Sequence, residues 1–472
     1  MKILLVTGRL AEKVVRENAL KAEVHVCDID IAAFITPKHL ESLDLKSYDL
    51  VLVPGLTKDC NWEEFENRKG VKVRLGPLHA SDIKRILKFV DKIDFSHKIP
   101  ACRLIEAIKA EEAIREVEKL EESAKFKIRD VAIGGESRMK IVAEIVKPSP
   151  ENLRERIAYF SENADIIDIG VPLEFDTNEL NKILKIAVDE SRKPISVDTF
   201  RKKAIEVAIS QGVDMVMSVS SSNLEVLGLI EDQAIVVAEK NLEALFKILE
   251  LAKKRTEKVI ADPILDPPLS VAESIGRYLQ FRKIDQETPL LFGAGNVTEL
   301  SDADSIGINA LLAFIAEEIG CNLLFTTEAS PKTAGSVKEL KIASYLSKIA
   351  KIRNAPPKDA GVSLLALKEK IKYETTKVKS FLVASESKEF HRDPKGDFII
   401  FIADGKIFCK HDRVTIAGER AKEIIDTILK LGLVSRLDHA AYLGRELMKA
   451  EIALRLGKNY IQDRDLNFGF LA

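Results

Sequence analysis

The chain has 472 residues, of which 46% are hydrophobic and 31% charged, so it can build two to four cores at roughly 100–200 residues per domain. Its 72 lysines and arginines nearly balance 74 aspartates and glutamates, which argues against a nucleic-acid or anionic-membrane surface, because such a surface needs a clustered basic field. No apolar run approaches the ~18 residues of a membrane span, and the five cysteines are scattered without C-x-x-C spacing, so we expect a cytoplasmic protein with reduced thiols.

Residues 1–125 alternate between short apolar runs and amphipathic segments. Four runs predict buried strands, and two segments with apolar residues at helical spacing predict helices. The strands are expected at 1–8, 22–29, 48–55 and 71–76, and the helices at 10–21 and 80–93. This pattern predicts a small Rossmann-like, doubly wound α/β domain. A charged helix over 105–127 is expected to lead away from it.

The alternation becomes more regular over residues 126–373. Eight apolar runs predict strands, and the segments between them mostly carry apolar residues at three- and four-residue intervals. The runs are 140–146, 165–170, 194–198, 214–219, 234–238, 259–263, 289–295 and 322–328. Two fused dinucleotide-binding halves would also alternate, but no G-x-G-x-x-G opens a helix here. Eight units of this length predict a central (β/α)₈ TIM barrel.

Residues 374–472 change pattern again. Antiparallel strands are expected at 381–387, 397–405 and 406–412, the last two joined by a tight turn at Asp404-Gly405. Helices are expected at 417–432 and 439–457. The second helix places four polar residues on one face, which we interpret as a packed or subunit interface in a small α+β domain that could form a homodimer. These residues are His439, Tyr442, Glu446 and Lys449.

Polar residues follow most of the eight predicted barrel strands, at the carboxyl ends where TIM barrels bind ligands. They are Lys147, Asp168, Asp198 with Thr199, Ser218 with Ser220, Glu239, Asp262, Asn296 and Glu328. Several of them, above all Thr199 and Ser220, could instead cap the next helix. The remaining carboxylates and amide would form a polar ring above an apolar interior.

The chemistry of this ring is rich in acceptors. No histidine lies between His97 and His391, so an imidazole base or a histidine-rich metal site in the barrel is excluded unless another domain supplies it. Carboxylates and an asparagine suit a pterin, whose edge carries an amino group and ring N–H donors. Each buried charge-assisted hydrogen bond would contribute roughly 1.5–3 kcal/mol.

Four stretches, at 164–170, 194–216, 262–270 and 292–314, resemble the pterin-binding family of dihydropteroate synthases and corrinoid-linked methyltetrahydrofolate methyltransferases. The whole chain resembles the archaeal dihydropteroate synthase-related proteins. The resemblance implies that Asp198 and Asp262 hold a reduced pterin. The last stretch is closer to the methyltransferase branch, which implies Asn296 as a third contact. From their places at strand ends, Asp168 and Glu328 are further candidates for pterin binding.

The chain also departs from the synthase pattern. Lys147 stands where the synthases carry an asparagine, and Met217-Ser218 replaces an Asn-Asp pair. The S-R-K motif is absent, and the R-x-H motif is replaced by Thr326-Thr327-Glu328. These departures imply a different site for the second substrate. Lys147 could still neutralise a diphosphate, although an ordinary solvated lysine explains it equally well.

Three hypotheses follow for function. The first is a dihydropteroate synthase-like transferase that joins a hydroxymethylpterin diphosphate to an arylamine. In it Lys147, Asp198 and Asp262 would be catalytic, Mg²⁺ could assist with the diphosphate, and the amine could be the ribofuranosylaminobenzene phosphate of tetrahydromethanopterin biosynthesis. The second is methyl transfer from a methyl-tetrahydropterin to a corrinoid partner protein, because the chain has no D-x-H-x-x-G motif of its own. The third is a non-catalytic pterin-binding protein.

Overall fold

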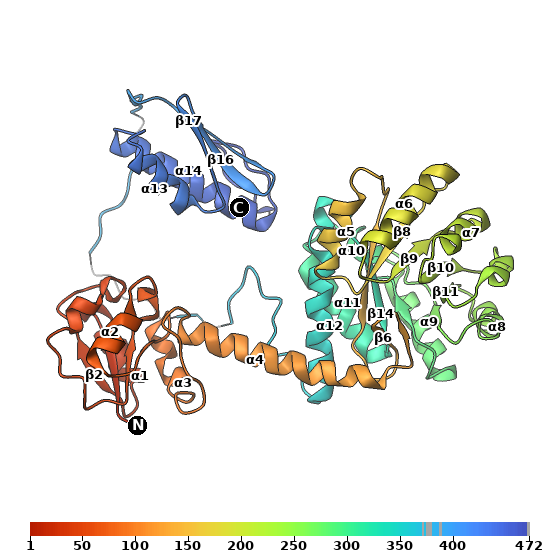
Figure 1. Cartoon of the computed structure of the whole chain (residues 1–472), viewed down its shortest axis with the longest axis horizontal. Coiled ribbons are helices and arrows are strands. Elements are labelled where there is room, and N and C mark those ends of the chain that lie inside the picture. The colour runs from red at the N-terminus through yellow and green to blue at the C-terminus, as the bar shows by residue number, and fades with distance from the viewer. Residues whose placement is uncertain (371, 374–379, 387–388, 470–472) are drawn as a thin grey trace. The chain divides into compact units, whose positions relative to one another are not determined.

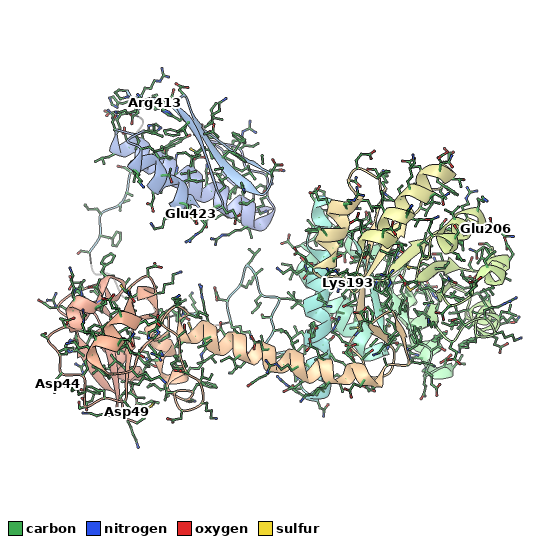
Figure 2. All side chains as sticks on the ribbon, viewed as in Figure 1. Asp44, Asp49, Lys193, Glu206, Arg413 and Glu423 are labelled. Atoms are coloured by element: carbon green, nitrogen blue, oxygen red, sulfur yellow. The ribbon has the colours of Figure 1, made fainter. Side chains whose placement is uncertain are left out.

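The computed structural model describes residues 1–370, 372–373, 380–386 and 389–469. The chain divides into two compact units, Met1–Glu374 and Thr375–Ala472, and Figure 1 shows the elements of each. Within the described part of the chain, no helix is long and apolar enough to cross a membrane. Figure 2 shows charged side chains over all parts of the chain, for example the exposed Asp44 and Asp49, and Arg413 and Glu423.

The amino-terminal domain is a four-stranded parallel sheet with strand order β2-β1-β3-β4. Alternate residues of the strands face two separate apolar clusters, so both faces of the sheet are covered. This arrangement confirms the predicted Rossmann-like fold. The strands are β1 (Ile3–Thr7), β2 (Glu23–Val26), β3 (Leu50–Val53) and β4 (Val73–Leu75), and the helices are α1 (Glu12–Asn18), α2 (Trp62–Lys69) and α3 (Ile83–Ile86).

One long helix and a hairpin connect this domain to the barrel. Helix α4 (Ala101–Glu118) packs its second half against the last barrel helix, α12 (Ser336–Ile352), through a small apolar cluster. The chain then forms a hairpin of β5 (Phe126–Ile128) and β6 (Val131–Ile133).

Eight parallel strands form the central sheet, in the order β12-β11-β10-β9-β8-β7-β14-β13. A parallel bridge between Ala261 and Leu290 joins the two ends of this order, so the sheet closes into a ring and the predicted TIM barrel is confirmed. The strands are β7 (Lys140–Ile145), β8 (Ile166–Gly170), β9 (Ile195–Asp198), β10 (Met215–Val219), β11 (Ala234–Ala238), β12 (Val259–Asp262), β13 (Leu291–Phe292) and β14 (Leu323–Thr327).

Helices surround the ring (Figure 1). They are α5 (Leu153–Ser161), α6 (Thr177–Glu190), α7 (Lys202–Ser210), α8 (Leu242–Ala252), α9 (Val271–Ile284), α10 (Gly295–Thr298), α11 (Ser305–Ile319) and α12. The helix expected after β10 is instead a short 3-10 helix, η7 (Leu224–Leu229). Gly228 lies inside this segment, and glycine disfavours the interior of an α-helix.

The interior of the barrel is apolar at its amino-terminal end. Side chains alternate along a strand between the two faces of the sheet, and one set from seven strands packs together with Ile128 and Ile133 of the hairpin. The hairpin therefore covers the amino-terminal end of the ring. The inward-facing set includes Val142, Ile166, Met215, Met217, Val236, Ile260, Leu291 and Leu323.

A buried ionic cluster ties the first strands to the last helix. Asp165, just before β8, is 8% exposed and accepts two hydrogen bonds from Arg138, at 2.9 and 3.0 Å. It also accepts the backbone N–H of Ile141 at 2.9 Å and pairs with Lys341 of α12. Arg138 in turn donates to Ser344 of α12 at 2.8 Å. The cluster therefore links the first two barrel strands, β7 and β8, to the last barrel helix, α12.

The second unit, a small α+β domain, has one antiparallel sheet with two helices on one face. Its elements are β15 (Ile399–Ala403), β16 (Lys406–His411), β17 (Val414–Gly418), α13 (Ala421–Lys430) and α14 (Leu437–Leu456). The predicted turn joins β15 to β16, and Asp404 and Gly405 have φ of 47° and 69°, as a two-residue hairpin turn requires.

Two predictions for this unit were wrong. The strand expected over 381–387 is absent from residues 381–386, where Phe381, Leu382 and Val383 are 78%, 98% and 85% exposed and so have no packing partner; Ser387 lies outside the described residues. The third strand is β17, whose last residues were assigned to a helix. A short apolar run fixes a strand only when a neighbouring strand pairs with it.

The polar face predicted on α14 packs inside its own unit. Glu446 is fully buried and accepts hydrogen bonds from Tyr460 and from the backbone N–H of Asp463. Tyr442 donates to Asp463, and Lys449 donates to the carbonyl of Arg464. The packed alternative therefore accounts for this face.

Candidate functional site

Four carboxylates lie in the barrel interior above its apolar layer. Glu144, Asp168 and Asp262 each lie two residues after an inward-facing apolar residue, so they face inward as well. Ser196, the partner of Asp168, lies two residues before Asp198 and fixes its direction in the same way. Strand register places Glu144 beside Asp168 and Asp198 beside Gly170. The strands thus place all four acids at the carboxyl end of the ring.

Asp168 is the deepest of these acids and is fully buried. Its Oδ1 accepts a hydrogen bond from Ser196, whereas its buried Oδ2 has no partner among the described residues. Burial raises the pKa of Asp168 well above its ordinary value, and the charges of Asp198 and Glu144 raise it further. Only the hydrogen bond from Ser196 opposes this rise.

Asp198 is aimed by a strained residue on the next strand. Ser218 donates its hydroxyl to Asp198 Oδ1 at 2.5 Å and has a φ of 65°, the left-handed region. The pairing of β10 with β11 shifts register between Val216 and Val219, and such bulges redirect side chains beside functional sites. Burial raises the pKa of Asp198, and the bond from Ser218 opposes this.

Asp262 is held by two donors on the same oxygen. The Tyr278 hydroxyl and the Ile264 backbone N–H both donate to Oδ1 at 2.8 Å, and no described residue donates to Oδ2. Burial raises the pKa of Asp262 to about 6 against the effect of these two bonds, and the charge of Asp198 adds to the rise. The two predicted pterin ligands are therefore electrostatically coupled, as acids that share one interior must be.

Glu144 was not predicted as a site residue. Burial raises the pKa of its carboxyl to about 7, with further contributions from the charges of Asp198 and Glu299 and an opposing one from Arg156. All the predicted site residues end a strand or follow one, whereas Glu144 lies inside an apolar strand. Its position at even spacing from Val142 is the signal that could have found it.

A cavity of about 310 Å³ opens beside two of the four acids, and Asp168 and Asp262 are not among its lining residues. Glu144 and Asp198 form its inner wall, and two cations, Lys147 and Arg201, line it with them. Neither cation has an ion-pair partner within the described ranges. Phe200 and Leu173, which are 57% and 75% exposed, form an apolar side of the cavity. The cavity is further lined by Val146, Gly170, Val171, Pro172 and Thr199.

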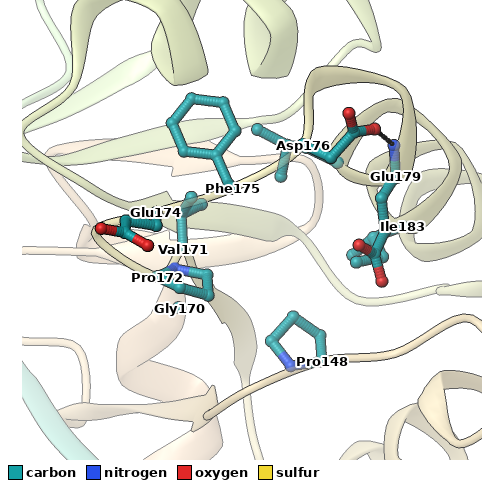
Figure 3. Close-up of a pocket in the computed structure, with 10 residues that line it drawn as sticks. Pro148, Gly170, Val171, Pro172, Glu174, Phe175, Asp176, Glu179 and Ile183 are labelled. Carbon is teal, nitrogen blue, oxygen red and sulfur yellow. Dashed lines mark hydrogen bonds between the residues drawn. The ribbon is translucent and has the colours of Figure 1, made fainter.

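A second cavity, of about 130 Å³, shares its wall with the first (Figure 3). Residues 170–172 line both cavities. The second has both apolar and acidic lining residues, and Figure 3 shows Pro148 across from the 170–176 segment and α6. Its apolar lining is Pro148, Val171, Pro172, Phe175, Leu180 and Ile183, and its acids are Glu174, Asp176 and Glu179. Asp176 caps α6, so Glu174 and Glu179 remain available.

Two other predicted ligands have different surroundings. Asn296 is exposed on α10 and donates its amide to the carbonyl of Leu265 at 2.8 Å, which leaves its Oδ1 as an acceptor. Glu328 follows Thr327, which pairs beside the inward-facing Glu144, and so points to the outer face. There its carboxylate accepts hydrogen bonds from the Tyr159 hydroxyl at 2.9 Å and from the Val337 backbone N–H at 3.0 Å. The structure does not bring Glu328 to the interior acids.

The remaining polar strand ends serve local structure. Thr199 accepts the backbone N–H of Arg201 at 3.2 Å, and the backbone N–H of Ser220 donates to Asn223 at 2.8 Å. Glu239 accepts from Ser221 at 2.7 Å. Thr199 and Ser220 do not cap the next helices, because the N-cap residues are Arg201 before α7 and Asn223 before η7, each without a side-chain cap bond.

Comparison with known proteins places the chain among relatives. It is 40% identical to the uncharacterized protein MJ0107 of Methanocaldococcus jannaschii, over 99% of either chain. The chain belongs to the archaeal dihydropteroate synthase-related family. In this family member, residues 392–463 match the model PterinBD-DUF4346. A Ycf91-like protein of Nostoc sp. is 35% identical over 15% of this chain and 83% of its own length.

Two solved structures are similar to this family member. One is 7,8-dihydropteroate synthase from Vibrio fischeri ES114, with 14% identity, a TM-score of 0.38, and coverage of 47% of this chain and 96% of that chain. The other is Yersinia pestis DHPS with a pterine-sulfa conjugate, with 14% identity, a TM-score of 0.37, and coverage of 46% and 95%.

Proposed function

We propose that the barrel binds a reduced pterin diphosphate and transfers its pterin-methyl group to an arylamine, as a dihydropteroate synthase-like transferase. One observation carries the proposal: Asp198 and two cations that have no ion-pair partner among the described residues line one cavity at the carboxyl end of the barrel. Asp262 lies outside the lining of this cavity but faces the same barrel interior. Such a site complements a ligand with N–H donors at one end and a phosphate group at the other.

The pterin ring is proposed to lie between the acids and the apolar side of the cavity. Asp198 and Asp262 accept the amino and ring N–H groups of the pterin edge. Because both carboxyls have raised pKa values, new donors favour their charged forms and strengthen the bonds. Phe200 offers an exposed ring face against which a flat heterocycle packs well.

Lys147 and Arg201 are proposed to bind the diphosphate. Attack by the amine nitrogen on the methylene carbon forms the C–N bond while the C–O bond to diphosphate breaks, and the bonding electrons leave with the diphosphate. The two cations stabilise this growing negative charge. Among the described residues, no group of three or more His, Cys, Asp and Glu is arranged to hold a metal ion, so the proposal assigns Mg²⁺ to no residue of this chain.

The smaller cavity is the proposed site of the amine. Its volume of about 130 Å³ compares with the roughly 150 Å³ of an apolar cavity that holds benzene, so it fits one aromatic ring. Glu174 and Glu179 repel a carboxylate attached directly to that ring. An arylamine with a ribofuranosyl phosphate in place of the carboxylate carries its negative charge beyond the ribose, further from these two glutamates, so the repulsion at the ring is weaker. This favours the tetrahydromethanopterin precursor over 4-aminobenzoate.

A diphosphate-release assay tests the function. The purified full-length protein is incubated with 6-hydroxymethyl-7,8-dihydropterin diphosphate and either 4-aminobenzoate or ribofuranosylaminobenzene phosphate. We expect diphosphate release that depends on the amine, and faster release with the second amine. No release with either amine would reject the transferase proposal.

Variants of the two cations give a second test, in which 6-hydroxymethyl-7,8-dihydropterin, the alcohol without the diphosphate, is the control ligand. In the variants Lys147→Ala and Arg201→Ala we expect about tenfold weaker binding of the pterin diphosphate, from the loss of one charge-assisted contact. Binding of 6-hydroxymethyl-7,8-dihydropterin, which has no diphosphate, should not change. Isothermal titration calorimetry measures both, and an equal loss for the two ligands would contradict the assignment.

One observation favours methyl transfer as a second candidate. The amide N–H of Asn296 donates to the carbonyl of Leu265, and its Oδ1, to which no described residue donates, could accept a hydrogen bond from a ring N–H of a methyl-tetrahydropterin. This candidate requires a corrinoid partner protein. It predicts demethylation of methyl-tetrahydropterin when a cob(I)alamin carrier is added, and no amine-dependent release of diphosphate.

A further inference from the structure

Glu144 of β7 has no part in the binding scheme above. We propose that Glu144 is the catalytic base that takes the proton lost by the attacking amine, an inference that rests on the proposed transferase function.

The carboxylate lies at the junction of the two cavities. Glu144 lines the larger cavity, and a methyl group added to Gly170 would overlap its Oε1. Gly170 belongs to the wall that both cavities share. The carboxylate is therefore next to the place where a pterin methylene in one cavity would meet an amine nitrogen from the other.

Glu144 is also the uncommitted acid of the interior. Asp168, Asp198 and Asp262 each accept a hydrogen bond from a serine or tyrosine hydroxyl. The carboxylate of Glu144 has no hydrogen bond or ion pair within the described parts of the chain. Both of its oxygens are thus free for a substrate proton.

The reaction releases one proton at this place. When the amine nitrogen bonds to the methylene carbon it becomes positively charged, and it returns to neutrality by giving an N–H proton to the Glu144 carboxylate. The electrons of the broken C–O bond leave with the diphosphate. Charge and atoms balance without a further reactant, and the proton passes to solvent after the product leaves.

The charged groups around Glu144 keep it suited to this work. Asp198 from β9 and Glu299 from the segment after α10 raise its pKa, whereas Arg156 from α5 lowers it, and together with burial they give a pKa of about 7. Asp168 of the neighbouring β8 lies beside Glu144, and the charge of Glu144 raises the pKa of Asp168. A base is most effective when its pKa lies near the working pH. Only the ionised form accepts the proton, so kcat should rise as the pH passes through this value.

The test compares Glu144→Gln with wild type in the diphosphate-release assay and in calorimetry. We expect kcat to fall by about 100-fold, the usual contribution of a positioned base, without weaker binding of the pterin diphosphate. The wild-type rise of kcat near pH 7 should vanish in Glu144→Gln. Glu144→Asp should restore part of kcat and the pH dependence.

Two further variants separate catalysis from structure. Glu299→Gln removes a neighbouring charge and keeps the base, so we expect an unchanged limiting kcat and an inflection at lower pH. Gly170→Ala keeps Glu144 but displaces its carboxylate, so kcat should fall while binding of the pterin diphosphate persists. If Glu144→Gln retains wild-type kcat and its inflection, the inference is overturned and the transferase function stands. If the wild type releases no diphosphate, the function and this inference fall together.

Discussion

Replacing Asp165 by alanine is expected to lower the free energy of unfolding of the barrel by about 3–5 kcal/mol, the cost of breaking a buried ion pair. The variant leaves Arg138, 3% exposed, and the partly buried Lys341 without their shared carboxylate. It also removes the acceptor of the Ile141 N–H. Urea unfolding followed by far-ultraviolet circular dichroism measures the loss, because the single tryptophan, Trp62, lies outside the barrel.

The effect should fade in acid. Burial alone would raise the pKa of Asp165, but the charges of Arg138 and Lys341 hold it below its usual range. The stabilisation is therefore complete above the unfolded value of about 3.9 and is lost as the pH falls towards the folded value. The control is Asp232→Ala, which removes an exposed partner of Lys258 and should cost less than about 1 kcal/mol. Equal losses in both variants would contradict the prediction.

Asp198→Asn and Asp262→Asn are each expected to weaken pterin binding by about 1–3 kcal/mol, roughly 5- to 150-fold in Kd. An amide keeps the size of the side chain but replaces a charged acceptor, so the bond to a pterin N–H is no longer charge-assisted. Because the charge of Asp198 raises the pKa of Asp262, Asp198→Asn favours the ionised form of Asp262 and offsets part of its own cost. The double variant should therefore lose more than the sum of the single variants.

Calorimetry with 6-hydroxymethyl-7,8-dihydropterin checks these values. Asp232→Asn, which changes an exposed residue just before the amino-terminal end of β11, should bind like the wild type. Wild-type affinity in both single variants would remove Asp198 and Asp262 from the pterin site. A loss in Asp232→Asn as well would show that the assay reports folding and not the site.

The barrel was predictable because its signal is repeated. All eight predicted strands are present, and seven of the segments between or after them contain α-helix, since buried parallel strands read as apolar runs and their covering helices as amphipathic ones. The small second unit was harder. Phe381–Val383 has the composition of a strand but no partner, and β17 has a partner in β16 but a weak apolar pattern.

The site was predictable in part for a similar reason. Asp198 and Asp262 end their strands, so strand direction alone placed them at the binding face. Glu328 also ends a strand, but one residue further along, and the alternation of side chains turned it to the outer face. The register shift that aims Ser218 at Asp198 depends on the pairing of β10 with β11, which no single segment encodes. Glu144 could likewise be predicted only by knowing which face of β7 points into the barrel.

Residues 170–172 form one wall with a cavity on either side, each of which is proposed to hold a ligand. If binding of one ligand moves this wall, the shape of the other cavity changes as well. The affinities of the two cavities for their ligands are therefore linked. Thermodynamic linkage makes this effect reciprocal: if the first ligand strengthens the second by some factor, the second strengthens the first by the same factor. The short segment after β8 would thus act as a heterotropic coupling element between two occupants of a single barrel.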